Sequence, residues 1–349
     1  MTIAVWFPAL FKEDYSNFRQ FIVETFFSFV SRHPDKKFFI ITDTAPLNSF
    51  PQNIEVVLVR PRPANALLRQ IWWDVRMPGI LKKIKADLFM SFENWCSMAA
   101  PIPQSIVIPP TEKITPAFIK KAQLVFVLNE SMRNQLQKNH DEQHKKITTI
   151  YPCASKRFKM ADDKEKEHTK AAHSDGKEFF LYNSHFSRKE DLIELLKSFS
   201  HFKKRQQSSF KLLLLTESNS FFEKSLSSYK YRGDVKFIGK KNDLAMITAS
   251  AYAVVLPFNT NEDMIAALNS MQSGVPVIAT KNSIISEMAG DAILSADKGG
   301  NDIGDKMMQL YKDENYRSSL IEKGRSLAAT FTQEKTAEGL WQSIMKALQ

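Results

Sequence analysis

The stretch NEDMIAALNSMQSGVPVIAT (261–280) brings polar side chains to the beginning of one helical pattern. Glu262 and Asp263 stand where the helix is expected to begin, and the helix dipole favours carboxylates at that end. Asn261 and Asn269 can accept hydrogen bonds from hydroxyl groups, without the charge that roughly doubles the strength of such bonds. These residues fit either a hydroxyl-binding site or a helix that stabilises its own N-terminus.

A second polar stretch, FFLYNSHFSRKEDL (179–192), places Arg188 and Lys189 at the expected start of another helix. Two cations at the start of a surface helix are usually solvated. An arginine also offers a forked set of donors that suits anionic oxygens. The pattern alone leaves both roles open.

The sequence offers little support for a metal site, a disulfide or a dinucleotide-binding site. Cys96 and Cys153 have neither metal-ligand nor disulfide spacing, and so few cysteines suit a reducing compartment. His168 and His173 lie in a charged stretch without neighbouring ligands. No G-x-G-x-x-G follows a strand, which disfavours a dehydrogenase or similar nucleotide-binding protein. We expect no metal and no cofactor.

Length and charge narrow the class further. A chain of 349 residues with 43% hydrophobic content is expected to form two globular domains. The net charge of +10 is spread over both halves, and it fits solubility or attraction to anionic lipid headgroups. Nucleic-acid binding is disfavoured because the aromatic residues follow apolar helical patterns. With no secretion signal or apolar span expected, we predict a cytoplasmic protein, with peripheral binding to the inner face of the membrane left open.

Strand-like runs alternate with helical patterns along the chain, and they are too continuously apolar to have one wet face, which predicts parallel sheets covered on both sides. The runs are IAVW (3–6), FFIIT (38–42), VVLV (56–59), DLFMS (87–91), SIVI (105–108), LVFVL (124–128), FFLY (179–182), KLLLL (211–215), VKFIG (235–239), YAVVLP (252–257) and VPVIAT (275–280). In the first half, Phe18, Phe21, Ile22, Phe26 and Phe29 recur at helical spacing and predict one apolar core stripe.

The alternation divides the chain into four parts. Residues 1–153 are expected to form an N-terminal Rossmann-like domain, and 179–330 a C-terminal Rossmann-like domain. Residues 154–178, nearly all charged or small, are predicted to be a linker or solvated loop. Residues 331–349 are predicted to form a helix that packs back toward the N-terminal domain.

The second half resembles the donor domain of retaining glycosyltransferases of family 4. The segments that carry the resemblance are FFLYNSHFSRKEDLIELLKSF, VKFIGKKNDLAMITASAYAVVLPF, NEDMIAALNSMQSGVPVIATKNSIISEMAGDAIL and YRSSLIEKGRSLAATFTQEKTAEGLWQSIMKAL, which together span roughly residues 177–349. The resemblance is weaker over 1–153. It implies an α/β protein of the GT-B fold, in which two doubly wound domains face each other across a cleft. The resemblance makes 1–153 the acceptor-side domain and 179–330 the domain that binds the nucleotide-sugar donor.

The resemblance also implies residues for binding a nucleotide-diphosphate sugar. Lys189 falls at the family's diphosphate-binding lysine, and Arg188 could add a second donor to the phosphates. Where the family has a Gly-Arg pair, this chain has Ser184 and His185. Cations and helix N-termini are what a departing diphosphate requires.

The signature carboxylates of the family are replaced. Asn261 and Asn269 stand at the positions of its two glutamates, and Glu262 could supply the first after a slip of one residue. Glycines usually follow that first glutamate, whereas this chain has Glu262, Asp263 and Met264 there. The two carboxylates would repel a diphosphate by ~4 kcal/mol for each close pair of charges at an effective dielectric constant near 20.

The N-terminal half departs from the family as well. Arg19 aligns with an arginine often found there, although an ordinary helix-surface position explains it too. The expected His after the fifth strand is absent, since Pro109 and Pro110 stand at that point. Glu93 and Asn94, after the fourth strand, are the candidates for the missing polar group.

The sequence therefore predicts a glycosyltransferase that moves a sugar from a nucleotide-diphosphate sugar to a hydroxyl of a glycan or lipid-linked acceptor, in polysaccharide or glycolipid assembly. The alternative is a catalytically degenerate GT-B protein that acts as a sugar- or partner-binding subunit.

Overall fold

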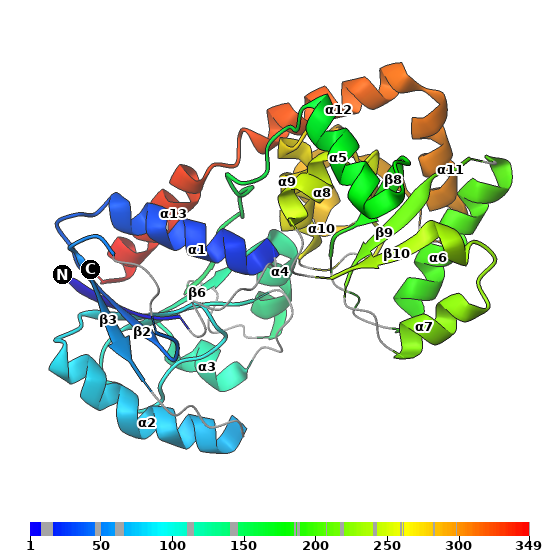
Figure 1. Cartoon of the computed structure of the whole chain (residues 1–349). Helices are drawn as coiled ribbons and strands as arrows, with labels where there is room; N and C mark the ends of the chain where they lie inside the picture. Colours follow the sequence, from blue (N-terminus) through cyan, green and yellow to red (C-terminus); the bar gives the residue numbers. More distant parts are fainter. Residues whose placement is uncertain are drawn as a thin grey trace. The chain divides into compact units, whose positions relative to one another are not determined.

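The computed structural model forms two compact units (Figure 1). Unit 1 comprises Met1–Asp14, Ile22–Tyr151 and Gln333–Gln349, and unit 2 comprises Tyr15–Phe21 and Pro152–Thr332. The structure describes all residues except 8–16, 46–49, 60–65, 110–114, 140–145, 185, 187–188, 207, 217–219, 240–242, 259, 261, 282, 298 and 349.

Unit 1 is built on a parallel sheet whose described strands run in the order β3-β2-β1-β4-β5-β6-β7. The elements are β1 (Thr2–Trp6), α1 (Asn17–Ser31), β2 (Lys37–Thr42), β3 (Ile54–Leu58), α2 (Ala66–Lys83), β4 (Leu88–Ser91), β5 (Gln104–Val107), α3 (Pro116–Lys121), β6 (Leu124–Val127), α4 (Glu130–Asn139), β7 (Ile147–Thr149) and α13 (Gln333–Leu348).

Both faces of this sheet are covered, which explains why its strands are almost continuously apolar. Ala4 and Trp6 of β1 pack with Trp73 and Met77 of α2 on one face. Helix α1 covers the other face with Ile22, Phe26 and Phe29 of the predicted stripe, and Phe26 contacts Phe38 of β2 edge to face. Figure 1 shows α1 and α13 on one side of the sheet and α2 on the other. Phe21 of the stripe is buried as well, in the part of α1 that belongs to unit 2, whereas Phe18 there is half-buried. The spacing therefore predicted the core correctly except at Phe18.

Unit 2 has a second parallel sheet, in the order β10-β9-β8-β11-β12-β13 among its described strands. Its elements are α5 (Asp163–Ser174), β8 (Phe179–Tyr182), α6 (Lys189–Arg205), β9 (Lys211–Leu215), α7 (Ser220–Ser227), β10 (Val235–Ile238), α8 (Leu244–Ala249), β11 (Ala253–Leu256), α9 (Asp263–Gln272), β12 (Val277–Thr280), α10 (Ile284–Ala289), β13 (Leu294–Ala296), α11 (Gly300–Lys312) and α12 (Glu314–Ala328).

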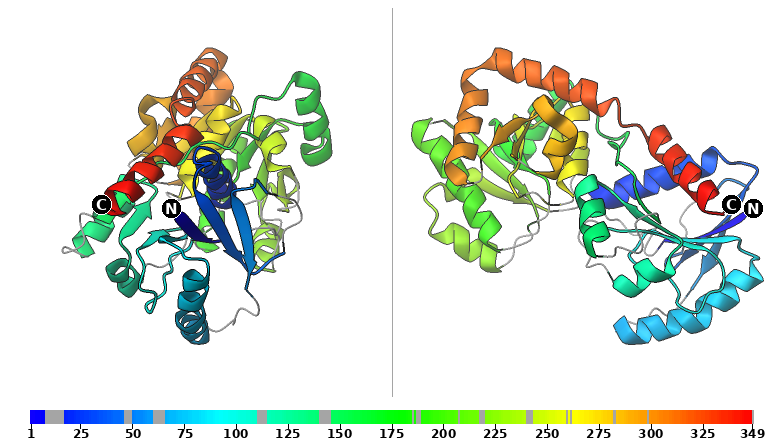
Figure 2. Two further views of the ribbon diagram at one scale, coloured as in Figure 1. Left: turned by 90° about the vertical axis from the view of Figure 1, so that its left-hand side faces the viewer. Right: turned by 180° about the vertical axis from the view of Figure 1, so that it is seen from behind.

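Alternate residues of β8 point into two different cores. Phe180 and Tyr182 pack with α6 and α11, while Phe179 and Leu181 pack with α8 and α9. The views from the side and from behind show helices on both faces of this sheet (Figure 2). Gly274, which follows α9, has φ +71°, the left-handed conformation predicted for it.

The prediction of a linker or loop over 154–178 was wrong for Asp163–Ser174, which forms α5. A reciprocal capping box begins this helix: the Asp162 carboxylate accepts from the Glu165 amide over 2.8 Å, and Glu165 Oε2 accepts from the Asp162 amide over 2.9 Å. The segment has no apolar periodicity because local caps, rather than a wide buried face, define the helix.

The last helix, α13, belongs to unit 1 although the chain reaches it only after unit 2. Thr336 Oγ1 donates to the carbonyl oxygen of Tyr151 over 3.0 Å, and the Trp341 ring stacks on His33 with centroids 3.9 Å apart. These contacts tie both ends of the sequence into one unit.

Each sheet has a point where the strand order reverses, and ligands of such folds bind beyond the carboxyl ends of the strands at that point. In unit 1 it lies between β1 and β4, and in unit 2 between β8 and β11. Most of the described candidate site residues follow these four strands.

Candidate functional site

Three residues from two loops meet at the reversal point of unit 2. The Asp263 carboxylate, in the first turn of α9, accepts hydrogen bonds from Ser184 Oγ at 2.5 Å, from Thr260 Oγ1 at 2.6 Å and from the Thr260 amide at 2.8 Å. Ser184 follows β8, and Thr260 follows β11. The carboxylate therefore fastens the loops of two adjacent strands together at the start of α9.

The Asp263 carboxyl is buried in the interior of unit 2. Its side chain is 1% exposed, and burial raises the pKa of its carboxyl above the usual value, against the lowering effect of the hydrogen bonds from Ser184 and Thr260. Asp191, in the first turn of α6, is also 1% exposed and raises the pKa of Asp263 further. Protonation of this carboxyl would remove its negative charge and would therefore weaken the repulsion expected between Asp263 and a diphosphate.

Asn269 lies deeper in the same helix, and its side chain is fully buried. Its Oδ1 accepts from the Ser155 amide over 2.9 Å, and its Nδ2 donates to Oδ1 of Asn17 over 2.9 Å. Asn17 in turn donates through Nδ2 to the carbonyl oxygen of Asn183 over 3.0 Å. This chain of amides joins the start of α1 to α9 and to the residue that follows β8.

The sequence analysis missed Asn17, Asn183 and Thr260. Asn183 and Thr260 carry a usable signal, because each is a polar residue just beyond a buried strand that adjoins the reversal point. Asn17 has no such signal, since its partner Asn269 is 252 positions away.

The other residues predicted in unit 2 are placed as follows. Glu262 is half-buried, precedes α9 and forms no side-chain cap to it. Lys189 is the first residue of α6, so its backbone stands at that helix N-terminus, while its side chain is outside the described part of the chain. His185, Arg188 and Asn261 also lie outside the described residues. The structure thus brings together Ser184 and Asp263 of the predicted set.

In unit 1, Glu93 lies at the reversal point of the sheet. Its Oε2 accepts from the indole Nε1 of Trp6, at the end of β1, over 2.9 Å, and its backbone exchanges hydrogen bonds with Ser91 Oγ. Asn94 beside it is 5% exposed. Glu93 is therefore held in a defined position. Arg19 is half-buried on α1, in the part of that helix that belongs to unit 2.

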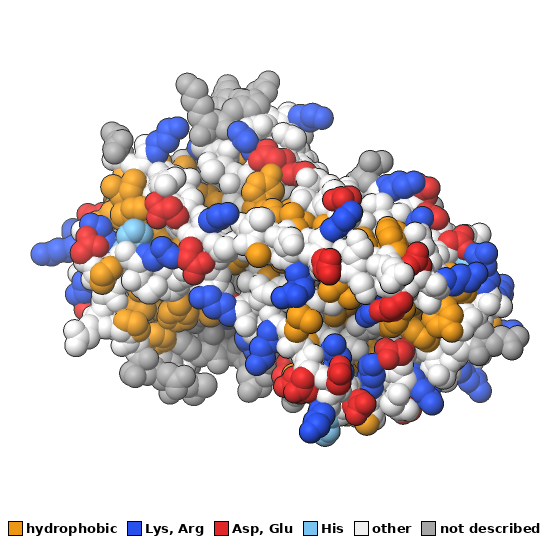
Figure 3. All heavy atoms as spheres, turned by 90° about the horizontal axis from the view of Figure 1, so that it is seen from above, with side chains coloured by type: hydrophobic (Ala, Val, Ile, Leu, Met, Phe, Trp, Pro, Cys, Tyr) orange, Lys and Arg blue, Asp and Glu red, His pale blue; other side chains and the backbone are white. Residues whose placement is uncertain are grey.

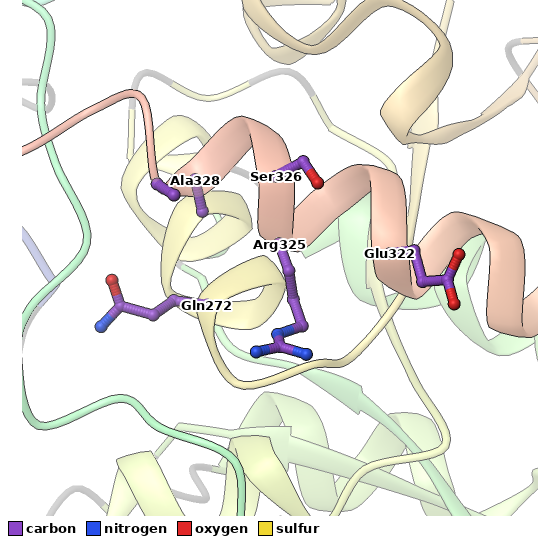
Figure 4. A pocket seen from close by; sticks show the side chains of 6 residues that line it. Gln272, Glu322, Arg325, Ser326 and Ala328 are labelled. Carbon is purple, nitrogen blue, oxygen red and sulfur yellow. The ribbon is translucent and has the colours of Figure 1, made fainter.

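A separate open pocket of about 600 Å³ lies at the other end of α9 (Figure 4). Gln272 lines it from α9, and Glu322, Arg325 and Ser326 line it from α12. The Gln272 side chain is held by hydrogen bonds to the carbonyl oxygens of Ser155 and Phe158. None of the predicted site residues lines this pocket.

Two further searches of the described residues gave negative results. They hold no group of three or more His, Cys, Asp or Glu side chains placed to bind a metal ion. None of the helices in that part of the chain combines the length and apolar character that a membrane crossing requires.

Comparison with known proteins gives one family match. Residues 163–327, which include β8, β11, α6 and α9, match the model of the family described as glycosyl transferases group 1. No curated protein sequence matches the chain.

Solved structures match over the whole length at low identity. WaaG, a glycosyltransferase involved in lipopolysaccharide biosynthesis, aligns with a TM-score of 0.77 at 12% identity over 99% of both chains. Alr3699/HepE of Anabaena, in complex with UDP and glucose, gives 0.75 at 12% identity, over 99% of this chain and 100% of that one. A glycosyltransferase from Rickettsia africae ESF-5 gives 0.74 at 13% identity, over 100% and 98%.

These likenesses establish the fold class predicted from the sequence: α/β, with two Rossmann-like parallel-sheet domains of the GT-B type. The family match is confined to residues 163–327, and the likeness of the whole chain to WaaG and to Alr3699/HepE is one of fold.

Proposed function

We propose that the protein is a glycosyltransferase that moves a sugar from a nucleotide-diphosphate sugar to an acceptor hydroxyl. The observation that carries this proposal is the reversal point of unit 2, where α6 and α9 both begin beside the loops of β8 and β11. The segment that matches the glycosyltransferase family contains all four elements. The solved complexes of Alr3699/HepE with UDP and with UDP-glucose support a uridine nucleotide as the first donor to test.

The proposed chemistry follows from the two helix N-termini. Their positive dipole ends favour phosphate oxygens, and the charge that develops on a departing diphosphate is stabilised there. Lys189, the first residue of α6, is proposed to add a cation, with Arg188 and His185 beside it. The inward hydrogen bonds of Asp263 keep its carboxylate from facing the phosphates directly.

We assign a retaining reaction of family 4 type, without a metal ion, on the resemblance of the sequence. The replaced signature residues are Asn261 and Asn269, so Glu262 is the carboxylate proposed nearest the donor sugar. Glu93, held by Trp6 at the reversal point of unit 1, is proposed to act on the acceptor side, with Asn94 and Arg19.

The proposed acceptor is a glycan or lipid-linked sugar, and the proposed process is polysaccharide or glycolipid assembly. WaaG, with a similar fold, is involved in lipopolysaccharide biosynthesis, which supports this class of process. We propose a cytoplasmic location, with peripheral attachment to the inner face of the membrane.

One observation favours the alternative of a non-catalytic binding subunit. Asn269, at the position of a family glutamate, uses both groups of its amide to bond Ser155 and Asn17. A residue occupied in this way holds the scaffold together, as expected if the fold has been kept while the chemistry was lost.

A donor screen separates the two functions. Thermal unfolding is measured with UDP-, GDP- and ADP-sugars, and a ligand at 100 times its Kd adds ~2.7 kcal/mol of apparent stability. The stabilising donor is then incubated with lipid-linked acceptors, and nucleotide release is followed. Stabilisation with release supports the transferase. Stabilisation without release supports a sugar-binding subunit, and no response to any donor contradicts the transferase and leaves a partner-binding subunit.

A further inference from the structure

Helix α2 is apolar on two opposite faces. Its inner face packs on the sheet of unit 1: Trp73, Met77 and Leu81 are buried, and the Trp73 ring meets Trp6 edge to face with centroids 4.4 Å apart. This face supplies the burial that a surface helix needs. The outer face therefore has no need of apolar residues for folding.

The outer face nevertheless presents a row of aliphatic side chains to solvent. Leu68, Ile71 and Val75 are 58%, 54% and 73% exposed. Their spacing of three and four residues places them on one side of the helix. Figure 1 shows α2 against the sheet with no described helix or strand of unit 1 beyond it. Single exposed aliphatics are ordinary, whereas a row of them marks an interaction surface.

The exposed charged side chains described on α2 itself are all basic. Arg76, Lys82 and Lys83 are exposed, and Lys82 follows Val75 by seven residues, which returns it to the same side of the helix. We call Leu68, Ile71, Val75, Arg76, Lys82 and Lys83 together the outer face of α2.

Asp74 is the one acidic residue in the sequence of α2, and it points away from this face. Its Oδ1 accepts from the Met98 amide over 2.7 Å and from Ser97 Oγ over 3.0 Å, and its Oδ2 accepts from Gln70. By contrast, the face of the molecule in Figure 3 shows basic and acidic side chains mixed throughout.

We propose that the outer face of α2 docks on an anionic lipid surface. A helix with aliphatic side chains and cations on one face lies in the plane of a bilayer interface, with the aliphatics among the acyl chains and the cations at the headgroups. Each cation near an anionic leaflet adds to the attraction for the surface. Arg76 also lies over the Trp72 ring, 5.6 Å from its centroid, and a tryptophan suits the headgroup level.

Charge argues against a second copy of this chain as the occupant. A two-fold dimer through α2 would bring Arg76, Lys82 and Lys83 of both copies into one interface, to which the outer face contributes no acidic side chain. Like charges in contact destabilise such an interface. An anionic lipid surface offers acyl chains to the aliphatic row and negatively charged headgroups to the cations.

This inference extends the proposed function but does not require it, since vesicle binding is measured without any sugar nucleotide. Purified protein is sedimented with vesicles of phosphatidylcholine alone and with mixed phosphatidylglycerol–phosphatidylcholine vesicles. We expect binding to the mixed vesicles that weakens with added salt, and little binding to phosphatidylcholine.

Two variants test the two parts of the face. Leu68→Gln/Ile71→Gln/Val75→Gln removes the aliphatic row, and Lys82→Glu/Lys83→Glu reverses two charges; each is expected to lower the partition coefficient by about tenfold or more. The matched controls are Ile193→Gln on α6, where Ile193 is 41% exposed, and Lys164→Glu/Lys166→Glu on α5; both should bind like the wild type. If the triple variant does not fold, Val75→Gln alone replaces it.

Several results would overturn the proposal. They are equal binding to both kinds of vesicle, binding to neither, and variants of α2 that bind as well as the controls. A protein that dimerises in sedimentation velocity, and loses the dimer in the α2 variants, would assign the face to a second copy instead.

Discussion

The side-chain amide of Asn269 donates to Oδ1 of Asn17 over 2.9 Å, inside the fully closed interior of unit 2. Asn17 begins α1, yet its contacts belong to the unit that holds α9. Asn269, which the sequence resemblance aligns with a glutamate of family 4, thus helps to hold the start of α1 beside Asn183, the residue that follows β8. Tests of this pair therefore address both the fold and the proposed function.

Asn269→Ala should destabilise the protein by ~2–4 kcal/mol. The substitution leaves the Ser155 amide and Asn17 Oδ1 buried without their partner, and each unsatisfied group costs ~1–3 kcal/mol. Urea unfolding measures the change. Asn301→Ala, at an exposed position of α11, is the control and should stay within ~0.5 kcal/mol of the wild type. Equal stability of the two variants would contradict a structural role for Asn269.

Asn269→Glu restores the glutamate of the family and discriminates between two roles. If Asn269 lines the donor site, as the resemblance predicts, the glutamate should tighten the binding of the nucleotide sugar. The burial of Asn269 predicts instead a lower melting temperature, because a carboxylate would enter a closed interior without a cation. We expect the second outcome. A stable variant with higher donor affinity by calorimetry would reverse this assignment.

Asp263 should make the stability of unit 2 depend on pH. Burial raises the pKa of its carboxyl above the ordinary 3.8, so the folded state holds the proton more tightly than the unfolded chain. The stability that it contributes is complete below pH 3.8 and is lost as pH rises through the raised pKa.

Asp263→Asn removes this titration: its Oδ1 can still accept from Ser184 Oγ and Thr260 Oγ1, whereas its Nδ2 cannot accept from the Thr260 amide. The free energy of unfolding of the wild type minus that of the variant should therefore fall as pH rises from below 3.8. Urea titrations at a series of pH values measure this difference. A constant difference at every pH would show that Asp263 is not held as its contacts imply.

Lys189→Ala should weaken binding of the donor found in the screen by ~1.5 kcal/mol or more, about tenfold, since a charge-assisted bond to phosphate is lost. Isothermal calorimetry measures the affinity. Lys197→Ala, an exposed lysine further along α6, is the matched control and should leave binding unchanged. Equal affinities of the two variants would remove Lys189 from the donor site.

The pKa of His33 should depend on the Trp341 ring that stacks on it. Burial lowers the pKa of His33 below 6.5, so the folded state binds this proton more weakly than the unfolded chain does. The stability that the neutral imidazole contributes is present above pH 6.5 and is lost as pH falls through the lowered pKa. Trp341→Ala uncovers the imidazole and should return its pKa toward 6.5, with a loss of ~2 kcal/mol of packing. Imidazole proton shifts by NMR follow the titration. An unchanged pKa in Trp341→Ala would mean that other groups bury His33.

The strands could be predicted because their signal is local. FFLY at 179–182 became β8 without change, since a strand buried on both faces must be apolar at every position. Two short strands, β7 and β13, were not predicted, because three residues carry too little pattern. The helix α5 was missed for the opposite reason: its stability comes from caps and not from an apolar stripe.

The sequence singled out two of the segments that meet at the reversal point of unit 2, and their binding of a donor stays a prediction. The sequence pointed to the loop after β8 and to the start of α9, and the structure places Ser184 and Asp263 of those segments in one hydrogen-bonded group. It did not predict that Thr260 completes this group, nor that Asp263 is buried. Burial and hydrogen-bond partners depend on how loops meet, which no spacing within one segment encodes.

The sequence by itself determined the parallel sheets, the order of their helices and the resemblance to glycosyltransferases, because apolar periodicity and short motifs act within a few turns of chain. Only the tertiary structure decided the use of the polar residues. Asn269 meets Asn17 across 252 positions, and Asp263 meets Ser184 across 79, because strand order at the reversal point brings those segments together. A side chain acquires its protonation state and its partners from that encounter.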